Sequence, residues 1–437
     1  MTNMEYAQGL SRLIQVKTVS GSGSENFAKL REVYKELFPN VYKTCIIEVV
    51  YKDAMLFKLK GKSDKKPIVL MAHQDVVPTE DSKWDYPPYD GVIDDGKVWG
   101  RGAMDCKNNV YAELQAFEEL ISEGVIPDND VYIALSDCEE NFGDSAIMVR
   151  DYLTKQGVKP FIVLDEGGAV IGKAYKGMVK RAAMVGVLEK GYADVKFIAK
   201  SKGGHSSSPG NNTPMVRLSR LILDIDKHNY FKNKMEPEIL EMFKGAAGCL
   251  KNGPLKFVLK HIGFFKPLVT LILPKVTPMG KALFATTIVF TMSKGAEAPN
   301  VIPQEATATA NLRFIPHQNS ENCLALLKKL ADKYDLEMEV LECRDAMPPV
   351  STKSEGYNYL TTCVAEGFPD VAIAPYIILG GTDCRHYQEI CDCSMRFSPM
   401  ELSFKQLQSM HSKNENIDVD AIGEGVSFFK ILIKNNK

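Results

Sequence analysis

Five short motifs of this chain concentrate histidine and carboxylate side chains. They are Met-Ala-His73-Gln-Asp75, Gly-Arg-Gly-Ala-Met-Asp105, Asp-Cys-Glu139-Glu140, Leu-Asp165-Glu166-Gly-Gly and His411-Ser-Lys-Asn-Glu415. Imidazole nitrogens and carboxylate oxygens are the ligands that zinc-like divalent ions accept, and two histidines with several carboxylates suffice for a pair of ions. The motifs therefore predict a hydrolase with two metal ions.

Each motif alone also has an ordinary explanation. His73 could end a surface strand, Asp105 could cap a helix, and Glu139-Glu140 could form a solvated acidic turn. Adjacent carboxylates that point inward repel each other unless a cation is near, however. With a metal present, one of them can be a ligand and the other a general base. Five such coincidences at the ends of predicted elements favour the metal site.

The five motifs lie next to predicted strands and helices that alternate along the chain, as in an α/β fold. Short apolar runs at 67–73, 131–135 and 161–164 predict buried strands, and apolar spacing predicts a helix over 105–124. Acidic or histidine residues stand at the carboxyl end of each predicted strand. Because open α/β sheets bind ligands at that edge, we expect the motifs to converge on one crevice.

The chain divides into three sections. From about Val179 the pattern changes to strands at 193–199, 286–292 and 306–314 with helices at 215–225 and 321–334, which predicts an inserted α+β domain over 181–348. The α/β pattern resumes over 349–437. A site that unites His73 with His411 requires segments 1–180 and 349–437 to form one catalytic domain.

Residues 228–281 are apolar but interrupted by lysines and prolines. We expect helical packing inside the inserted domain, and a membrane-surface or partner-binding element remains the alternative. The longest uncharged stretch falls far short of the roughly 18–20 residues that a transmembrane helix needs.

Composition is that of an ordinary globular protein, with 437 residues, 45% hydrophobic and 25% charged residues and a formal net charge of -2. We expect no nucleic-acid and no membrane partner. The N-terminus lacks the pattern of a signal peptide, so we expect a cytoplasmic location. The ten cysteines are scattered without the spacing of a metal site, which predicts reduced thiols.

Further motifs complete a family resemblance. They are Gly-Gly-His205-Ser-Ser-Ser-Pro, Asn300-Val-Ile-Pro, Asn-Leu-Arg313-Phe and Gly-Gly381-Thr382-Asp-x-Arg385. Together with the first five, in order from about residue 10 to 430, they resemble the di-zinc exopeptidases and aminoacylases. That family includes aminoacylase, carboxypeptidase S, glutamate carboxypeptidase and succinyl-diaminopimelate desuccinylase, and the resemblance is strongest to the carboxypeptidase S branch.

The resemblance implies a mixed-sheet, three-layer α/β zinc-exopeptidase catalytic domain with an inserted α+β lid. It also implies a metal site in which His73 and Asp165 hold one Zn²⁺, Glu140 and His411 hold the other, and Asp105 bridges them. Co²⁺ or Mn²⁺ could replace zinc in such a site. Glu139 would be the general base, Asp75 would orient His73, and relatives often have a cis peptide after the bridging aspartate.

The resemblance further implies how the substrate is bound. His205 would stabilise the oxyanion, from the same chain or from a partner subunit, so that a monomer and a homodimer both remain open. The substrate's free carboxylate would be held by residues of the later motifs, namely Asn300, Arg313, Gly381, Thr382 and Arg385.

The expected activity is hydrolysis of the amide bond of a dipeptide, short peptide or N-acyl amino acid, which releases a free C-terminal amino acid. Peptidase activity is favoured over an aminoacylase-type deacylase. Two further alternatives stay open: a non-hydrolytic metal-dependent binder, which would have no need of Glu139, and a membrane-associated lipid-amide hydrolase.

Overall fold

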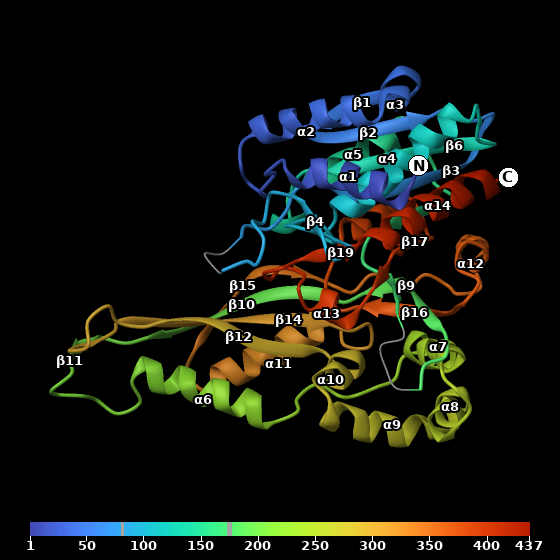
Figure 1. Ribbon diagram of the computed structural model, residues 1–437. Coiled ribbons are helices and arrows are strands. Elements are labelled where there is room, and N and C mark those ends of the chain that lie inside the picture. The colour runs from blue at the N-terminus through green and yellow to red at the C-terminus, as the bar shows by residue number, and fades with distance from the viewer. Residues whose placement is uncertain (80–82, 173–176) are drawn as a thin grey trace.

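A ten-stranded mixed sheet forms the centre of the computed structural model, which describes residues 1–79, 83–172 and 177–437 (Figure 1). In spatial order its strands are β1 (Ile46–Tyr51), β2 (Ala54–Leu59), β6 (Asn129–Ser136), β3 (Ser63–His73), β7 (Ile162–Asp165), β17 (Ser394–Arg396), β9 (Arg181–Glu189), β8 (Ala169–Ile171) and β18 (Glu401–Leu402), with β16 (Val371–Ile378) paired to β9. Strand β3 runs parallel to both β6 and β7. The catalytic motifs of the first segment therefore share one edge of the sheet.

Helices cover both faces of this sheet. One face carries α1 (Asn3–Ile14), α4 (Lys107–Ser122), α12 (Glu355–Gly367) and α14 (Val419–Asn435), and the other carries α5 (Ser145–Lys155) and the 3-10 helix η3 (Asp383–Glu389). Ile68 and Leu70 of β3 pack toward the first face and Val69 and Met71 toward the second. A strand buried on both faces needs an unbroken apolar run, which explains the pattern at 67–72. The three-layer α/β architecture is confirmed.

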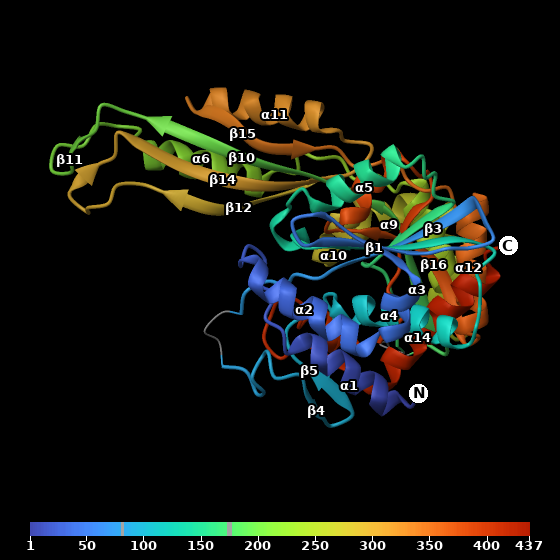
Figure 2. The same cartoon turned by 90° about the horizontal axis from the view of Figure 1, so that it is seen from above.

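The lid is a four-stranded antiparallel sheet. Its order is β12 (Thr287–Lys294), β14 (Glu305–Phe314), β10 (Gly191–Lys200) and β15 (Glu337–Arg344), and α6 (Pro214–Lys227) and α11 (Ser320–Lys333) share a core with it. At its tip β11 (Gly204–His205) pairs with β13 (Val301–Ile302). Figures 1 and 2 both show the tip projecting away from the catalytic domain.

The boundary of the lid differs from the expected one. Strand β9 lies in the large sheet, so the first catalytic segment continues to Glu189 rather than ending at residue 180. Only Lys190 separates β9 from β10, and the apolar pattern therefore shows no break between the two sheets.

Four helices of the inserted section pack differently from the expectation. They are α7 (Pro237–Ala246), α8 (Pro254–Lys260), α9 (Ile262–Val276) and α10 (Pro278–Phe284). Ile239, Ile262 and Phe284 belong to the core of the large sheet and not to the core of the lid. This section is helical, as expected, but it extends the catalytic domain.

The remaining elements are short or peripheral. They are α2 (Ser24–Leu37), α3 (Pro39–Thr44), β4 (Val92–Asp94), β5 (Lys97–Trp99), η1 (Glu139–Asn141), η2 (Ala247–Cys249), α13 (Phe404–Leu407) and β19 (Asn416–Asp418).

A buried ion pair ties the end of β9 to β17. Glu189 Oε1 accepts hydrogen bonds from Arg396 Nε at 2.6 Å and from the Thr382 hydroxyl at 2.5 Å. Replacing Glu189 with alanine leaves the Arg396 charge buried and unpaired, so we expect the free energy of unfolding to fall by about 3–5 kcal/mol. Urea denaturation measures the loss.

The exposed pair Arg12–Glu36 supplies the control. Glu36→Ala should change the unfolding free energy by only about 0–1 kcal/mol. Equal losses in the two variants would contradict the argument from burial.

Candidate active site

The predicted strand ends deliver their side chains to one place. His73 is the last residue of β3, Asp165 is the last residue of β7, and Glu139 and Glu140 form the turn η1 just after β6. Because these three strands are parallel neighbours, the three motifs meet at the carboxyl edge of the sheet.

Asp105 lies between the two histidines. Its Oδ1 is 2.9 Å from His73 Nε2, and its Oδ2 is 3.0 Å from His411 Nε2. His411 Nε2 is also 3.2 Å from Glu140 Oε2. One carboxylate thus contacts two ligand groups, as a residue that bridges two metal ions must do.

These contacts shift the pKa values of His411 and Asp105. The carboxylates of Asp105 and Glu140 raise the pKa of His411 to about 10. Burial opposes ionisation of Asp105, but its hydrogen bonds from His411 and His73 outweigh burial and lower its pKa. The cluster therefore stabilises positive charge between its carboxylates.

Glu415 holds the loop that carries Asp105. Its Oε1 accepts backbone N–H groups of Gly102, Met104 and Asp105 at 3.1, 2.8 and 3.0 Å. Its Oε2 pairs with Arg101 at 2.6 Å. Helix α4 begins only at Lys107, with no side-chain cap at its start, so Asp105 does not act as the N-cap. The Asp105–Cys106 peptide is cis, in agreement with the resemblance.

Asp75 contacts both the turn that carries Glu139 and Glu140 and the ring of His73. Its carboxylate oxygens accept the backbone N–H groups of Glu139 and Glu140, each at 3.2 Å. The closer contact to His73 Nδ1 comes from the backbone carbonyl of Asp75 at 2.9 Å, whereas the carboxylate lies 3.5 Å away. The main chain of Asp75 therefore does more to orient His73 than its side chain does.

Asp165 and Glu166 differ in the partners of their carboxylates. The two oxygens of Asp165 accept the backbone N–H groups of Glu166 at 2.9 Å and Cys384 at 2.8 Å. Burial, followed by the charge of Asp383, raises the pKa of Asp165 to about 7. Burial also raises the pKa of Glu166, whose carboxylate is influenced by the charges of Asp105 and His73. Both oxygens of Asp165 are thus occupied by backbone N–H groups, whereas the carboxylate of Glu166 is close enough to Asp105 and His73 to sense their charges.

The donor set fits a pair of divalent ions. Two groups have ligand atoms within 4.8 Å of one another: His73, Asp105 and Cys106, and Asp105, Glu140 and His411. Within the described residues, the buried Glu140 Oε1 has no hydrogen-bond partner. Glu139 is only 9% exposed, and burial raises its pKa. Crowded buried carboxylates with an unpaired oxygen are the arrangement that cations stabilise.

An arginine cluster stands next to this carboxylate cluster. The guanidinium of Arg313 lies 4.7 Å from the Tyr192 ring centre, and that of Arg344 lies 4.8 Å from Tyr192 and 5.3 Å from Phe142. Arg385 lies 5.9 Å from Phe142. Phe142 directly follows η1, so the two aromatic rings connect the arginines to the turn that carries Glu139.

The three arginines repel one another. Burial lowers the pKa of Arg344, and the charges of Arg385 and Arg313 lower it further. A Cβ atom on Gly381 would lie 3.4 Å from a guanidinium nitrogen of both Arg344 and Arg385, so this glycine leaves space beside them. A substrate carboxylate would relieve the repulsion.

Thr382 lies beside the arginine cluster, but its side chain is buried. Its carbonyl accepts a hydrogen bond from Arg385 at 2.6 Å, and its hydroxyl donates to Glu189. Two of the predicted residues lie elsewhere. His205 and Asn300 are exposed at the lid tip, where the carbonyl of Asn300 accepts the N–H of Ser206 and the His205 ring contacts Ser207. Figures 1 and 2 place this tip at the end of the lid farthest from the catalytic domain, so a single chain in this conformation does not bring His205 to the cluster.

The family model described as peptidase family M20/M25/M40 matches residues 69–435. The chain belongs to this family. This M20-family protein is therefore a hydrolase enzyme, and the resemblance to the carboxypeptidase S branch is confirmed.

Individual proteins agree with this assignment. The chain is 31% identical over 450 residues to "Probable carboxypeptidase S-like 2" of Dictyostelium discoideum, covering 100% of this chain and 86% of that protein. It is 32% identical to the "N-fatty-acyl-amino acid synthase/hydrolase PM20D1" of Xenopus tropicalis, covering 99% and 86%. The M20 family metallo-carboxypeptidase Sso-CP2 from Sulfolobus solfataricus shares the fold, with a TM-score of 0.72, 18% identity and 99% coverage of both chains.

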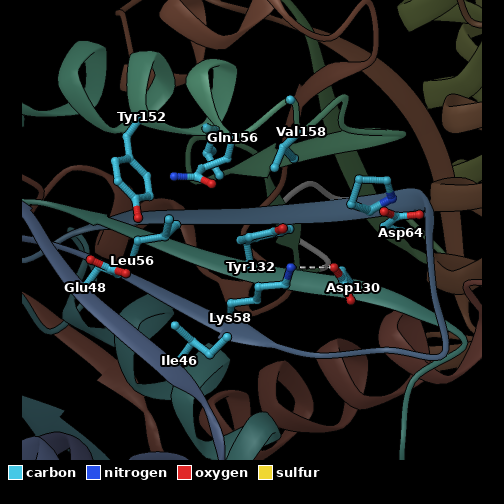
Figure 3. A pocket seen from close by; sticks show the side chains of 13 residues that line it. Ile46, Glu48, Leu56, Lys58, Asp64, Asp130, Tyr132, Tyr152, Gln156 and Val158 are labelled. Atoms are coloured by element: carbon cyan, nitrogen blue, oxygen red, sulfur yellow. Dashed lines mark ion pairs between the residues drawn. The ribbon is translucent and has the colours of Figure 1, made fainter.

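A separate pocket of the M20 hydrolase lies away from this site (Figure 3). Strands β1, β2 and β6 and the C-terminal part of α5 line it, with residues such as Ile46, Tyr132 and Tyr152. Its Lys58 and Asp130 pair with each other at 2.7 Å. None of the residues that line this pocket belongs to the cluster.

Sequence reasoning missed three residues of the site. The motifs by themselves assign no role to Glu166 or Glu415, although both residues belong to the first five motifs. The deciding signal for Glu166 is that adjacent residues at a strand end point in opposite directions. Arg344 ends β15 outside any motif, and only the packing of the lid against η1 places it in the site.

Proposed function

We propose that this M20 hydrolase cleaves the amide bond of a short peptide or N-acyl amino acid and releases a free C-terminal amino acid. The observation that carries the proposal is the position of Asp105 between His73 and His411, next to a cluster of three arginines. The first cluster suits metal-assisted hydrolysis, and the second suits a substrate with a free carboxylate.

Two divalent ions, zinc by preference, would be held by two sets of residues. One set comprises His73, Asp105 and Glu166, and the other comprises Asp105, Glu140 and His411. Cys106 is a less suitable ligand than Glu166, because burial strongly raises the pKa of its thiol. When bound, such ions supply Lewis acidity to a water molecule and to the amide carbonyl.

Glu139 would act as the general base. The backbone N–H of Glu139 donates to Asp75 at 3.2 Å, at the same turn as Glu140. Burial raises the pKa of the Glu139 carboxyl group, which makes its carboxylate a stronger base. The carboxyl oxygen of Glu139 would take the proton of the attacking water and then deliver it to the leaving nitrogen. Arg344 and Arg385, with Arg313, would hold the carboxylate of the leaving amino acid.

The proposal is tested by metal content and a substrate panel. Purified protein should contain about two equivalents of zinc. It should hydrolyse members of a panel of dipeptides, N-acetyl amino acids and N-fatty-acyl amino acids, and lose this activity on chelation. Amidated versions of the same compounds should react poorly, since they lack the free carboxylate. Metal-independent turnover would contradict the proposal.

The proposal includes two activities, a peptidase and a deacylase of N-acyl amino acids. They differ in the group on the acyl side of the amide bond. The relatives include a carboxypeptidase S-like protein and an N-fatty-acyl-amino acid synthase/hydrolase, and they support both. Dipeptide turnover that exceeds N-acyl turnover would favour the peptidase, and the reverse would favour the deacylase.

His205 would join the site from a second copy of the chain or after movement of the lid. Its exposed position at the lid tip supports this view. Light scattering at working concentrations distinguishes a homodimer from a monomer.

Glu166 rather than Asp165 should control metal affinity. Glu166→Gln removes a ligand charge, so we expect zinc content to fall toward one equivalent and zinc affinity to fall by about 10–100-fold or more, at least the loss typical of an outer-shell partner. Asp165→Asn keeps one acceptor oxygen for the two backbone N–H groups and should retain more zinc. Elemental analysis compares the variants, with Cys106→Ser as a third. Normal zinc content in Glu166→Gln would indicate that Asp165 or Cys106, and not Glu166, is the metal ligand.

Arg344 should contribute to carboxylate binding. Arg344→Met keeps the contact with Phe142 and Tyr192 but removes the charge. A hydrogen bond to a charged group contributes about 1.5–3 kcal/mol, so kcat/KM should fall about 10–100-fold, mainly through KM. The amidated substrate provides the control, because its slow turnover should be unaffected. An equal effect on both substrates would contradict the role.

A further inference from the structure

A long basic segment of the chain contains no acidic residue. Residues 242–296 include eight lysines and no aspartate or glutamate, although the whole chain has a formal net charge of -2. Lys244 and Lys294 pair with Glu241 and Glu297 just outside the segment. Within the described part of the chain, the other six have no carboxylate partner: Lys251, Lys256, Lys260, Lys266, Lys275 and Lys281.

Helix α9 lies in the middle of this segment and is apolar on two opposite faces. Ile262, Val269 and Leu273 pack on the core of the catalytic domain. On the other face the side chains of Phe264, Leu268, Leu271 and Ile272 stay exposed, and Phe264 is 83% exposed. Their spacing of four, three and one residues places them in one stripe along the helix.

The exposed stripe continues at both ends. Leu255 and Phe257 of α8 and Val276 of α9 are more than half exposed. Single exposed apolar residues are ordinary on a protein surface, but a contiguous patch marks a binding surface. Of the six lysines, Lys251, Lys260, Lys275 and Lys281 are exposed. We name the seven apolar residues, together with these four lysines, the α8–α9 face. Figure 1 shows α8 and α9 on the outer side of the molecule, opposite α1 and α2.

We propose that the α8–α9 face binds the surface of an anionic phospholipid bilayer. Apolar side chains would enter the boundary between headgroups and acyl chains, and the lysines would contact the phosphate groups. The inference does not depend on which amide the enzyme cleaves.

The positive charge of the α8–α9 face favours an anionic bilayer over a second copy of the chain as its binding partner. A symmetric contact between two copies would place the same four exposed lysines of each copy against one another, and like charges disfavour that contact. A bilayer with anionic headgroups provides the opposite charge over a wide area.

The face lies on the membrane rather than across it. Among the described residues no single helix is long and apolar enough to cross a bilayer, and α8 and α9 meet this requirement only as a pair bent by 105°. Ile262 and Val269 anchor α9 to the catalytic domain along its inner side. This attachment leaves only the outer side available to lipid.

Vesicle co-sedimentation of the full chain tests the proposal. We expect binding to vesicles of phosphatidylcholine with one third phosphatidylglycerol, weak binding to pure phosphatidylcholine, and release at high salt. Combined Lys260→Gln, Lys275→Gln and Lys281→Gln substitutions, at exposed lysines, should weaken binding to the anionic vesicles about a hundred-fold, from roughly 1 kcal/mol per lysine. Phe264→Ser with Leu268→Ser and Leu271→Ser should weaken it at least as much.

Matched substitutions elsewhere serve as controls. Lys65, Lys155 and Lys159 are exposed lysines outside the segment, and their combined change to glutamine removes the same charge. Val289→Ser with Met292→Ser removes apolar residues that are 57% and 69% exposed on the lid. Both controls should bind vesicles like the wild type, and hydrolysis of a soluble substrate should be equal in all variants.

Three results would overturn the proposal. They are absence of wild-type binding to anionic vesicles, an equal loss in the control variants, and a concentration-dependent dimer that the Phe264, Leu268 and Leu271 substitutions abolish while vesicles are not bound. The last result would identify a second copy as the partner of this face.

Discussion

Replacing Glu139 with glutamine should lower kcat by about 10²–10⁴-fold, the usual contribution of a general base. Glutamine has nearly the same shape and keeps the hydrogen bond from the residue 139 backbone to Asp75. It cannot accept the proton of the attacking water. Glu139 is absent from both candidate ligand groups, so metal content should stay at the wild-type level. Steady-state kinetics and elemental analysis of one preparation measure both quantities.

The control for this variant is Glu389→Gln. Glu389 is an exposed carboxylate on η3 that pairs with Arg150, and its loss should leave kcat unchanged. Unchanged kcat in Glu139→Gln would refute the general-base role. It would also revive the alternative of a metal-dependent binder, which has no need of a base.

Replacing Asp105 with alanine should abolish turnover. It should also abolish the increase in Tm that zinc causes in the wild type. Asp105 contacts both histidines, and its loss removes the only residue common to both candidate ligand groups of the described residues. Free zinc at about 100 times its dissociation constant should stabilise the wild type by about 2.7 kcal/mol. We expect no comparable shift of Tm in Asp105→Ala, and zinc content below one equivalent.

Asp137→Ala is the matched control for this second variant. Asp137 lies in the same acidic motif as Glu139, but its carboxylate accepts the backbone N–H of Asp53 at 3.1 Å and belongs to neither ligand group. The variant should lose some stability while its Tm still rises with zinc. A zinc-induced shift of equal size in Asp105→Ala would argue against a bridging role.

The sequence predicted the catalytic layer well because the signals there are local. Buried parallel strands need unbroken apolar runs, so β3, β6 and β7 could be read from 67–73, 131–135 and 161–164. The carboxyl ends of parallel neighbouring strands lie at the same edge of a sheet, which is why the sequence predicts that His73 and Glu140 lie close together. Helix α4 likewise follows from its apolar spacing and from Gly124.

The boundary between the catalytic domain and the lid could not be predicted from local sequence patterns. Strands β9 and β10 belong to different sheets, yet one residue separates them and both are apolar. Helices α7 to α10 were expected inside the lid, but Ile239 and Ile262 pack on the large sheet. An apolar helix face shows that a partner surface exists, and only the tertiary structure shows which surface it is.

By itself, the sequence determined the family, the α/β catalytic layer, the paired histidines and carboxylates, and Glu139 as the candidate base. These features depend on residue type and short spacing. The folded structure was needed to show that backbone N–H groups occupy both oxygens of Asp165, that Arg344 joins Arg313 and Arg385, and that His205 lies at the distant lid tip. Each of these depends on the direction of a side chain or on the packing of segments far apart in the chain, and neither is encoded in local spacing.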